Sequence, residues 1–232
     1  ETKHLWPVVA PESGRVEILN DVIFNNSVQN KAKHFIDNFN TTQLDINWNF
    51  RRYPIEDVYK INKEENRLNL FCHPNQIKER GRAALLGFKQ TESDFEYLTQ
   101  MYFQPKSTDS EAGISLFQKD DNYINFTIIK KGDKHQLQVY AIKNGEILEL
   151  IKDELRQYKG NIKFKVIADK DVYKLYYSLK GMDFRLFTSL EGSYLKSNGY
   201  TGAHLGLYAT GNGKNNQDFA SFDYVNYLIK KK

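Results

Sequence analysis

The segment TGAHLGLYATGNG, residues 201–213, places glycines inside what otherwise reads as a buried strand. A glycine in a strand costs roughly 0.5–1 kcal/mol relative to alanine, because the backbone loses more freedom and no side chain packs. We therefore expect these glycines where a curved sheet bends or where another strand comes close. The positions concerned are Gly202, Gly206 and Gly211.

Strand-like runs of the same kind recur about every ten residues from Phe35 onward, separated by turns rich in Gly, Asn, Asp and Lys. In residues 94–103, DFEYLTQMYF, apolar and polar side chains alternate with a period of two, which is typical of a half-buried strand. Residues 111–142 read as three strands and residues 161–179 as a hairpin. The best helix candidate, ILELIKDELRQY at 147–158, has no N-cap residue and could equally be a strand followed by a loop.

These patterns predict an all-β protein with the architecture of a two-sheet antiparallel β-sandwich of the jelly-roll type, because about a dozen strands occur without alternating helices. The 15 Tyr and 15 Phe suit the core between two such sheets. Residues 34–232 form the predicted sandwich domain. Residues 1–33, which contain Pro7, Pro11 and Gly14 and no sustained period, are predicted to be a leader or linker.

Composition excludes several functional classes. The 33 basic and 29 acidic residues are spread along the chain and give a net charge of +4, which argues against a nucleic-acid-binding protein. No run of apolar residues is long enough for a membrane span. Cys72 is the only cysteine and is expected in the core, so an internal disulfide is impossible. The compartment stays open, with a bacterial periplasmic or secreted protein favoured, and the start at Glu1 is compatible with removal of a signal or a preceding domain.

The order of the segments resembles the C-terminal concanavalin A-like β-sandwich module of glycoside hydrolase family 43, of the β-xylosidase and α-arabinofuranosidase type. The segment WPVVAPE, residues 6–12, is similar to the segment that closes the five-bladed propeller of those enzymes. The stretches that carry the resemblance are IDNFNTTQLDINWNFRRYP (36–54), RLNLFCHPNQIKERGRAALLGFKQTESDFEYLTQMYFQP (67–105), EAGISLFQKDDNYINFTIIKKG (111–132), KLYYSLKGMDFRLF (174–187) and TGAHLGLYATGNGKNNQDFASFDYVNY (201–227).

The resemblance implies an accessory module that packs on a catalytic propeller and shapes its substrate entrance, in an enzyme acting on xylan- or arabinan-type plant polysaccharide. The family's catalytic residues lie on the propeller, so none is carried over, and whether this chain is itself an enzyme stays undecided. In some relatives a sandwich loop contributes a phenylalanine to the rim of the active site. The matching loop here, CHPNQIKERGR at 72–82, offers no Phe. Its corresponding residues are Ile77, Lys78, Glu79 and Arg80.

A structural calcium ion is a second implication of the resemblance. Acidic residues from the terminal strands bind Ca²⁺ in related sandwiches, and carboxylate oxygens suit that ion. Asp37 and Asp223 are the matching residues. The alternative is that Asp37 caps a turn and Asp223 pairs with an arginine or a backbone amide.

Carbohydrate binding is a further hypothesis, because a stand-alone lectin-like module would hold an oligosaccharide on the concave face of the sandwich. An aromatic ring flanked by hydrogen-bonding groups is the chemistry required. The candidates are Trp48, Arg51, Asn122 and Tyr123, with Trp48 alternatively a core or sheet-edge residue.

A complete small glycosidase is the third hypothesis. It would need a pair of carboxyl groups roughly 5–10 Å apart. The acidic residues considered for such a pair are Asp94, Glu96, Glu111 and Asp120, but the E-x-D-x-x-E signature of glycosidases with this fold is missing.

Overall fold

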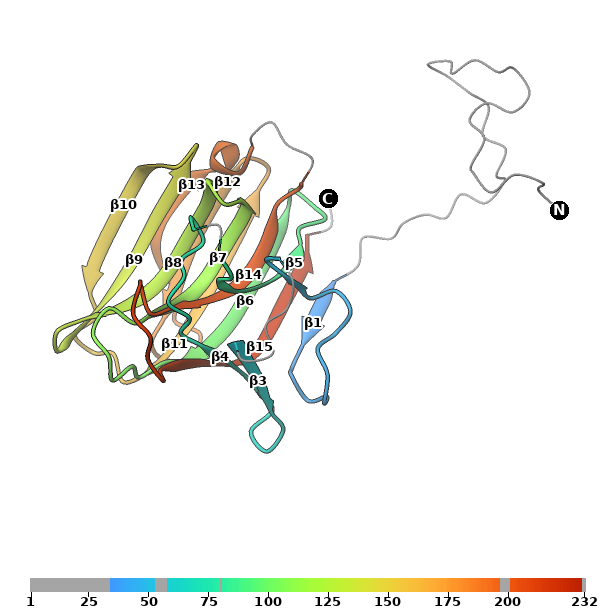
Figure 1. Ribbon diagram of the computed structural model, residues 1–232. Helices are drawn as coiled ribbons and strands as arrows, with labels where there is room; N and C mark the ends of the chain where they lie inside the picture. The colour runs from blue at the N-terminus through green and yellow to red at the C-terminus, as the bar shows by residue number, and fades with distance from the viewer. Residues whose placement is uncertain (1–33, 53–57, 80, 197–200, 231–232) are drawn as a thin grey trace, which may run out of the picture. The chain divides into compact units, whose positions relative to one another are not determined.

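A computed structural model describes residues 34–52, 58–79, 81–196 and 201–230, which fold as two antiparallel sheets packed face to face (Figure 1). Sheet A contains β1 (Phe35–Asp37), β3 (Tyr59–Asn62), β4 (Arg67–Phe71), β6 (Phe95–Tyr102), β11 (Asn161–Asp169), β12 (Val172–Ser178), β13 (Arg185–Glu191) and β15 (Phe219–Ile229). Sheet B contains β2 (Asn49–Phe50), β5 (Ala84–Lys89), β7 (Glu111–Lys119), β8 (Asn122–Lys131), β9 (Lys134–Lys143), β10 (Glu146–Glu154) and β14 (His204–Thr210). A short 3₁₀ helix, η2, covers Gly192–Leu195.

The strand order is β13-β12-β11-β6-β15-β4-β3 in sheet A, where β1 also pairs with β15, and β10-β9-β8-β7-β14-β5-β2 in sheet B. All of these strand pairs are antiparallel, so the predicted all-β antiparallel sandwich is confirmed. The two central strands β14 and β15 come from the end of the chain, and each pairs with at least two strands from much earlier in the sequence.

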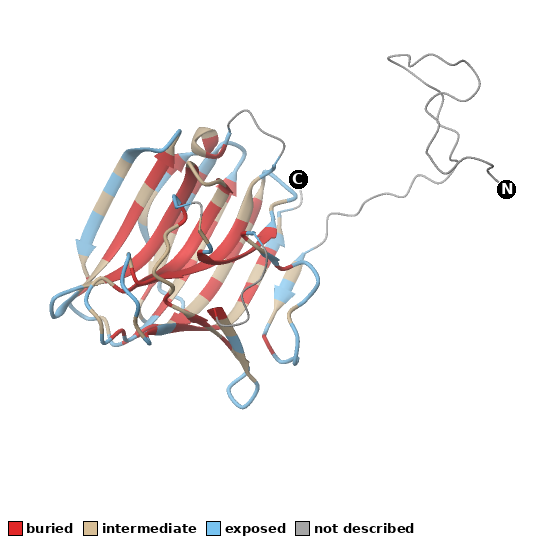
Figure 2. Cartoon of the chain, in the orientation of Figure 1, coloured by how far each residue is buried: buried red, intermediate tan, exposed pale blue. Residues whose placement is uncertain are grey.

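The hydrophobic core lies between the two sheets. Strand β6 shows how the sequence builds it, because Phe95, Tyr97 and Met101 are fully buried while the residues between them are partly exposed. The same alternation holds in β11, where Phe164 and Val166 point into the core. Figure 2 shows burial concentrated in the central strands of both sheets and lost toward β10 at one edge.

Gly206 and Gly211 have the close approach that the sequence predicted, whereas Gly202 does not, because the nearest atom to a Cβ built there is 4.0 Å away. A Cβ atom on Gly206 would lie 3.0 Å from the carbonyl oxygen of Leu86 and 3.3 Å from the Cα atom of Gly87, both on the adjacent strand β5. Gly213 follows β14 in a turn with φ at +89°, which L side chains rarely adopt. Gly206 permits tight packing of two strands and Gly213 permits the turn.

The segment 147–158 begins as an edge strand, not as a helix. Strand β10 pairs along its length with β9, and it exposes Ile147, Leu148 and Leu150 by half or more. The apolar residues that suggested a helical face therefore belong to a sheet edge.

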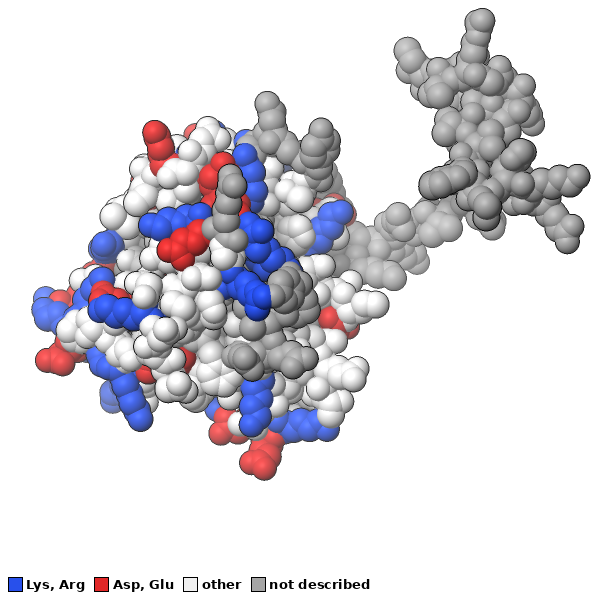
Figure 3. All heavy atoms as spheres, in the orientation of Figure 1, with Lys and Arg blue, Asp and Glu red and all other residues white. Residues whose placement is uncertain are grey.

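The predicted leader, residues 1–33, lies outside the described residues. Basic and acidic side chains are both spread over the face in Figure 3. In the described part of the chain, no helix has the length and apolar character needed to cross a membrane.

Candidate functional site

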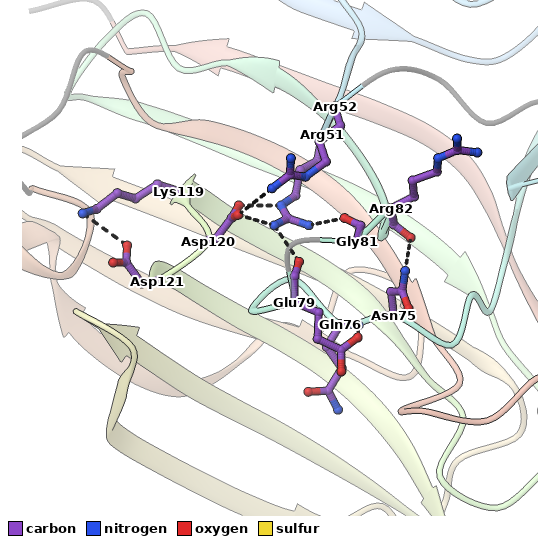
Figure 4. A network of polar contacts seen from close by, with 10 residues as sticks. All are labelled: Arg51, Arg52, Asn75, Gln76, Glu79, Gly81, Arg82, Lys119, Asp120 and Asp121. Atoms are coloured by element: carbon purple, nitrogen blue, oxygen red, sulfur yellow. Dashed lines mark hydrogen bonds and ion pairs between the residues drawn. The ribbon is translucent and has the colours of Figure 1, made fainter.

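The loop 72–82 connects β4 of sheet A to β5 of sheet B and is fastened by Arg51, which follows β2. The guanidinium donates from Nη1 to the carbonyl oxygen of Gly81 at 2.9 Å and from Nη2 to that of Glu79 at 2.8 Å (Figure 4). Within the loop, Asn75 Nδ2 donates to the carbonyl oxygen of Arg82 at 3.3 Å. An arginine from a distant segment thus anchors the loop through the backbone of Glu79 and Gly81.

Asp120, in the turn between β7 and β8, completes this network. Its Oδ1 accepts from Arg51 Nε at 2.6 Å, and its Oδ2 lies 2.5 Å from Arg51 Nη2. Arg52 Nη2 reaches the same Oδ2 at 3.2 Å from a more exposed position. The Arg51 side chain is only 3% exposed, so this residue positions the loop instead of presenting itself to a ligand.

Ile77 holds the same loop from its other side. It is fully buried in a small cluster on the outward face of sheet B, together with Leu85, Tyr123 and Tyr208. The buried Ile77 side chain presents no surface of its own at the rim of the loop. Lys78 and Glu79 are exposed at the tip of the loop, whereas Arg80 lies outside the described residues.

Trp48 is a core residue and not a surface ring. It is 7% exposed and packs between Phe35, Phe39 and Phe88. Its indole N–H donates to Asp37 Oδ2 at 2.7 Å. A ring enclosed in this way has no free face for a sugar, so the carbohydrate-binding role does not fit Trp48.

The calcium hypothesis does not fit the two aspartates. Asp37 Oδ1 accepts from the backbone N–H of Phe39 at 2.8 Å, so both of its oxygens hold protein donors. Asp223 accepts from Arg67 Nε at 2.8 Å and from Gln100 Nε2 at 3.0 Å. Because a calcium site needs six to eight oxygen ligands, and no group of three or more His, Cys, Asp or Glu is found among the described residues, these contacts favour the turn cap and the arginine pair.

Asn122 and Tyr123 are also enclosed by protein. Asn122 is fully buried and donates to the carbonyl oxygen of Tyr194 at 3.3 Å. Tyr123 is 3% exposed, and burial raises the pKa of its hydroxyl above the ordinary value of 10. Neither side chain is placed to contact a bound oligosaccharide.

Glu111, one of the acidic residues considered for a glycosidase pair, lies in a buried polar network on the outward face of sheet B. It is 2% exposed. Its Oε1 accepts from Thr127 Oγ1 at 2.8 Å and from Tyr140 OH at 2.9 Å, and its Oε2 accepts from Asn212 Nδ2 at 3.0 Å. Three donors from three different elements satisfy this carboxylate, so the network stabilises the sheet.

Comparison with known proteins identifies the family of this chain. Residues 36–228 match the family model described as the β-xylosidase C-terminal concanavalin A-like domain. A xylosidase/arabinosidase of Butyrivibrio fibrisolvens is 27% identical over 94% of this chain and 43% of its own length. The non-reducing end α-L-arabinofuranosidase BoGH43B of Bacteroides ovatus is 21% identical over 82% of this chain and 36% of its own length. The chain therefore spans less than half of each of these curated relatives.

Solved structures show the same fold at low sequence identity. The GH43B protein of a Bacteroides ovatus xyloglucan locus superposes with a TM-score of 0.78 at 19% identity, over 84% of this chain and 39% of that one. The GH43 protein BlXynB of Bacillus licheniformis gives 0.77 at 20% identity over the same shares. With the family model matched across nearly the whole described sandwich, the chain belongs to the family of β-xylosidase C-terminal concanavalin A-like domains, the accessory modules of glycoside hydrolase family 43.

Proposed function

We propose that this chain packs against a family 43 catalytic propeller and shapes the entrance to its active site, in an enzyme that acts on xylan- or arabinan-type polysaccharide. The proposal is supported by the observation that the chain covers only part of the length of its relatives. The chain matches one module of relatives whose remaining length, more than half of each, lies outside the match. Those relatives are named as a xylosidase/arabinosidase and an α-L-arabinofuranosidase.

The loop 72–82 is suited to the entrance role because it is rigid at its base and polar at its tip. Arg51 and Ile77 fix it from two sides, which lowers the entropy that a partner or substrate would have to remove on binding. Lys78 and Glu79 are the exposed residues at the tip. In this proposal they contact the outer end of the substrate or the propeller, in the place where some relatives use a phenylalanine.

The first experiment measures hydrolysis of aryl β-xyloside and aryl α-arabinofuranoside by this chain alone. We expect no turnover, because an accessory module leaves the reaction to its catalytic partner. Turnover that disappears when Glu111 or another single carboxylate is changed to its amide would overturn the proposal in favour of a complete small glycosidase.

The second experiment replaces the matching part of the Butyrivibrio fibrisolvens relative with residues 34–232 of this chain. We expect the chimera to melt at a higher temperature and to hydrolyse both aryl substrates faster than the same relative without any C-terminal module. Changing Lys78 to alanine in the chimera should alter KM or kcat without altering the melting temperature, and Glu79 is left in place because its carboxylate accepts from the backbone N–H of Gln76 at 3.0 Å. A chimera no better than the truncated relative would contradict a packing role for this module.

A further inference from the structure

A pocket of about 320 Å³ opens on the outward face of sheet B, beside the Arg51 network. Its floor is made of glycine, because Gly87 of β5 and Gly206 of β14 are register partners and both line it. The flanking Leu86 and Leu205 point into the core, so the glycines face outward. Two adjacent glycines leave a flat apolar depression where side chains would otherwise fill the space.

The walls of the pocket are apolar and aromatic. Leu85 and Phe117 stand on the same outward face as the glycines and form the apolar walls. Phe117 is half-buried, so part of its surface remains accessible. The floor and walls together offer apolar contact on more than one side of a small ligand.

The rim of the pocket carries hydrogen-bonding groups of both kinds. The Asp120 side chain is 35% exposed, and a carboxylate has about four acceptor sites, one more than its contacts with Arg51 and Arg52 use. Arg52 is 43% exposed and can donate outward. His204 Nδ1 donates to the carbonyl oxygen of Gly202 at 3.1 Å, and burial lowers the pKa of the ring, so its Nε2 is an acceptor near neutral pH. Asn49 is exposed and completes the polar rim.

This combination matches the chemistry of a sugar, whose ring presents C–H groups on its faces and hydroxyl groups around its edge. The volume lies at the lower end of the roughly 300–1,000 Å³ of small-molecule pockets, which suits one sugar ring or two. We propose that this pocket binds a neutral sugar ring of a xylan- or arabinan-type chain, with the ring face on Gly87 and Gly206 and its hydroxyls on Asp120 and Arg52. Of the residues that the sequence suggested for carbohydrate binding, Arg51 lines this pocket as the partner of Asp120, and Trp48, Asn122 and Tyr123 do not. The choice of sugar rests on the substrate class proposed above, whereas binding by the chain alone does not depend on the packing role.

The test uses the chain alone, titrated with xylotriose and with arabinotriose and followed by calorimetry and by amide NMR shifts. We expect saturable binding of at least one sugar with a roughly millimolar dissociation constant, and shifts at Gly87 and Gly206. Gly87→Val is the decisive variant. A Cβ atom on Gly87 meets only ordinary contacts, the shortest being 3.4 Å to the carbonyl oxygen of Leu205, so the new side chain enters the pocket without a clash at its base.

We expect Gly87→Val to weaken binding at least tenfold while the chain melts at or above the parent temperature, because valine favours a strand more than glycine does. Gly202→Ala is the matched control, since nothing lies closer than 4.0 Å to its added Cβ and the residue does not line the pocket. Phe117→Ala provides a second variant that opens the wall instead of filling the floor, and it should weaken binding too.

Two results would overturn the proposal. One is the absence of saturable binding for both sugars at tens of millimolar. The other is binding that Gly87→Val and Phe117→Ala both leave within twofold of the parent, which would mean that the sugar occupies a different surface.

Discussion

Replacing Arg51 with methionine should destabilise the protein more than any other exchange in the loop network. Methionine keeps most of the packing volume but removes the bonds to Asp120 and to the carbonyl oxygens of Glu79 and Gly81. Breaking a buried ion pair from one side costs about 3–5 kcal/mol. Asp120 is 35% exposed and keeps Arg52, so water and that arginine recover part of the loss and the lower end, about 3 kcal/mol, applies.

Arg52→Met is the matched control, because Arg52 pairs with the same carboxylate from a side chain that is 43% exposed, against 3% for Arg51. An exposed pair of this kind contributes less than about 1 kcal/mol. Urea unfolding followed by circular dichroism should show the larger loss for Arg51→Met with an unchanged m value. For a domain of this size, that loss lowers the melting temperature by about 6–12 °C. Equal losses for the two variants would refute the anchoring role of Arg51.

Three further predictions concern single side chains. Asp218 is 8% exposed; its burial alone would raise the pKa, but hydrogen bonds from Lys106, Ser107 and Ser110 hold it below the ordinary 3.8. The ionised form therefore stabilises the fold above pH 3.8, and this contribution is lost as pH falls through the lower, folded-state pKa. Asp218→Asn should lower the free energy of unfolding by about 3 kcal/mol at pH 7, as measured by urea unfolding. Below pH 3.8 the difference in unfolding free energy between variant and parent should be smaller, and a difference that does not change with pH would contradict this prediction. Burial raises the pKa of the Cys72 thiol to about 12. An aromatic disulfide reagent at pH 8 should therefore label this thiol only as fast as the protein unfolds. Rapid labelling of the folded chain would contradict the burial of Cys72. Added calcium or a chelator should leave the melting temperature unchanged, whereas a rise with calcium that Asp37→Asn abolishes would restore the metal hypothesis.

Local patterns in the sequence predicted the strands well because a period of two is a local property. In the run from Phe95 to Phe103 the alternation of apolar and polar residues identifies the buried face, and the structure confirms it. The helix candidate at 147–158 was ambiguous because its apolar residues lie on an exposed edge strand. No second layer of the described residues buries one face of that strand, so its apolar residues do not follow the strand period of two.

Side-chain roles were harder to predict because they depend on residues that are distant in the chain. Tyr123 is covered by Ile77 from the loop 72–82, and no pattern around Tyr123 reveals that cover. Arg51 pairs with Asp120, which is 69 positions away in the sequence. The residue predicted to contact a sugar is therefore an internal anchor. For a similar reason the sequence does not predict the pocket lining, since Gly87 and Gly206 become neighbours only when β5 pairs with β14.

The central places of β14 and β15 have a consequence for how the chain reaches its fold. Without them, β4 and β3 are separated from the rest of sheet A, and β5 and β2 from the rest of sheet B. Both sheets are therefore closed only when β14 and β15 pair, and most of these contacts join residues more than a hundred positions apart, such as Leu86 with Leu207. High contact order of this kind slows folding, so the facing edges of β6, β4, β7 and β5 stay unpaired until β14 and β15 pair with them. The pairing of β14 and β15, and not the completion of any single hairpin, should be the step that commits this domain to its native state.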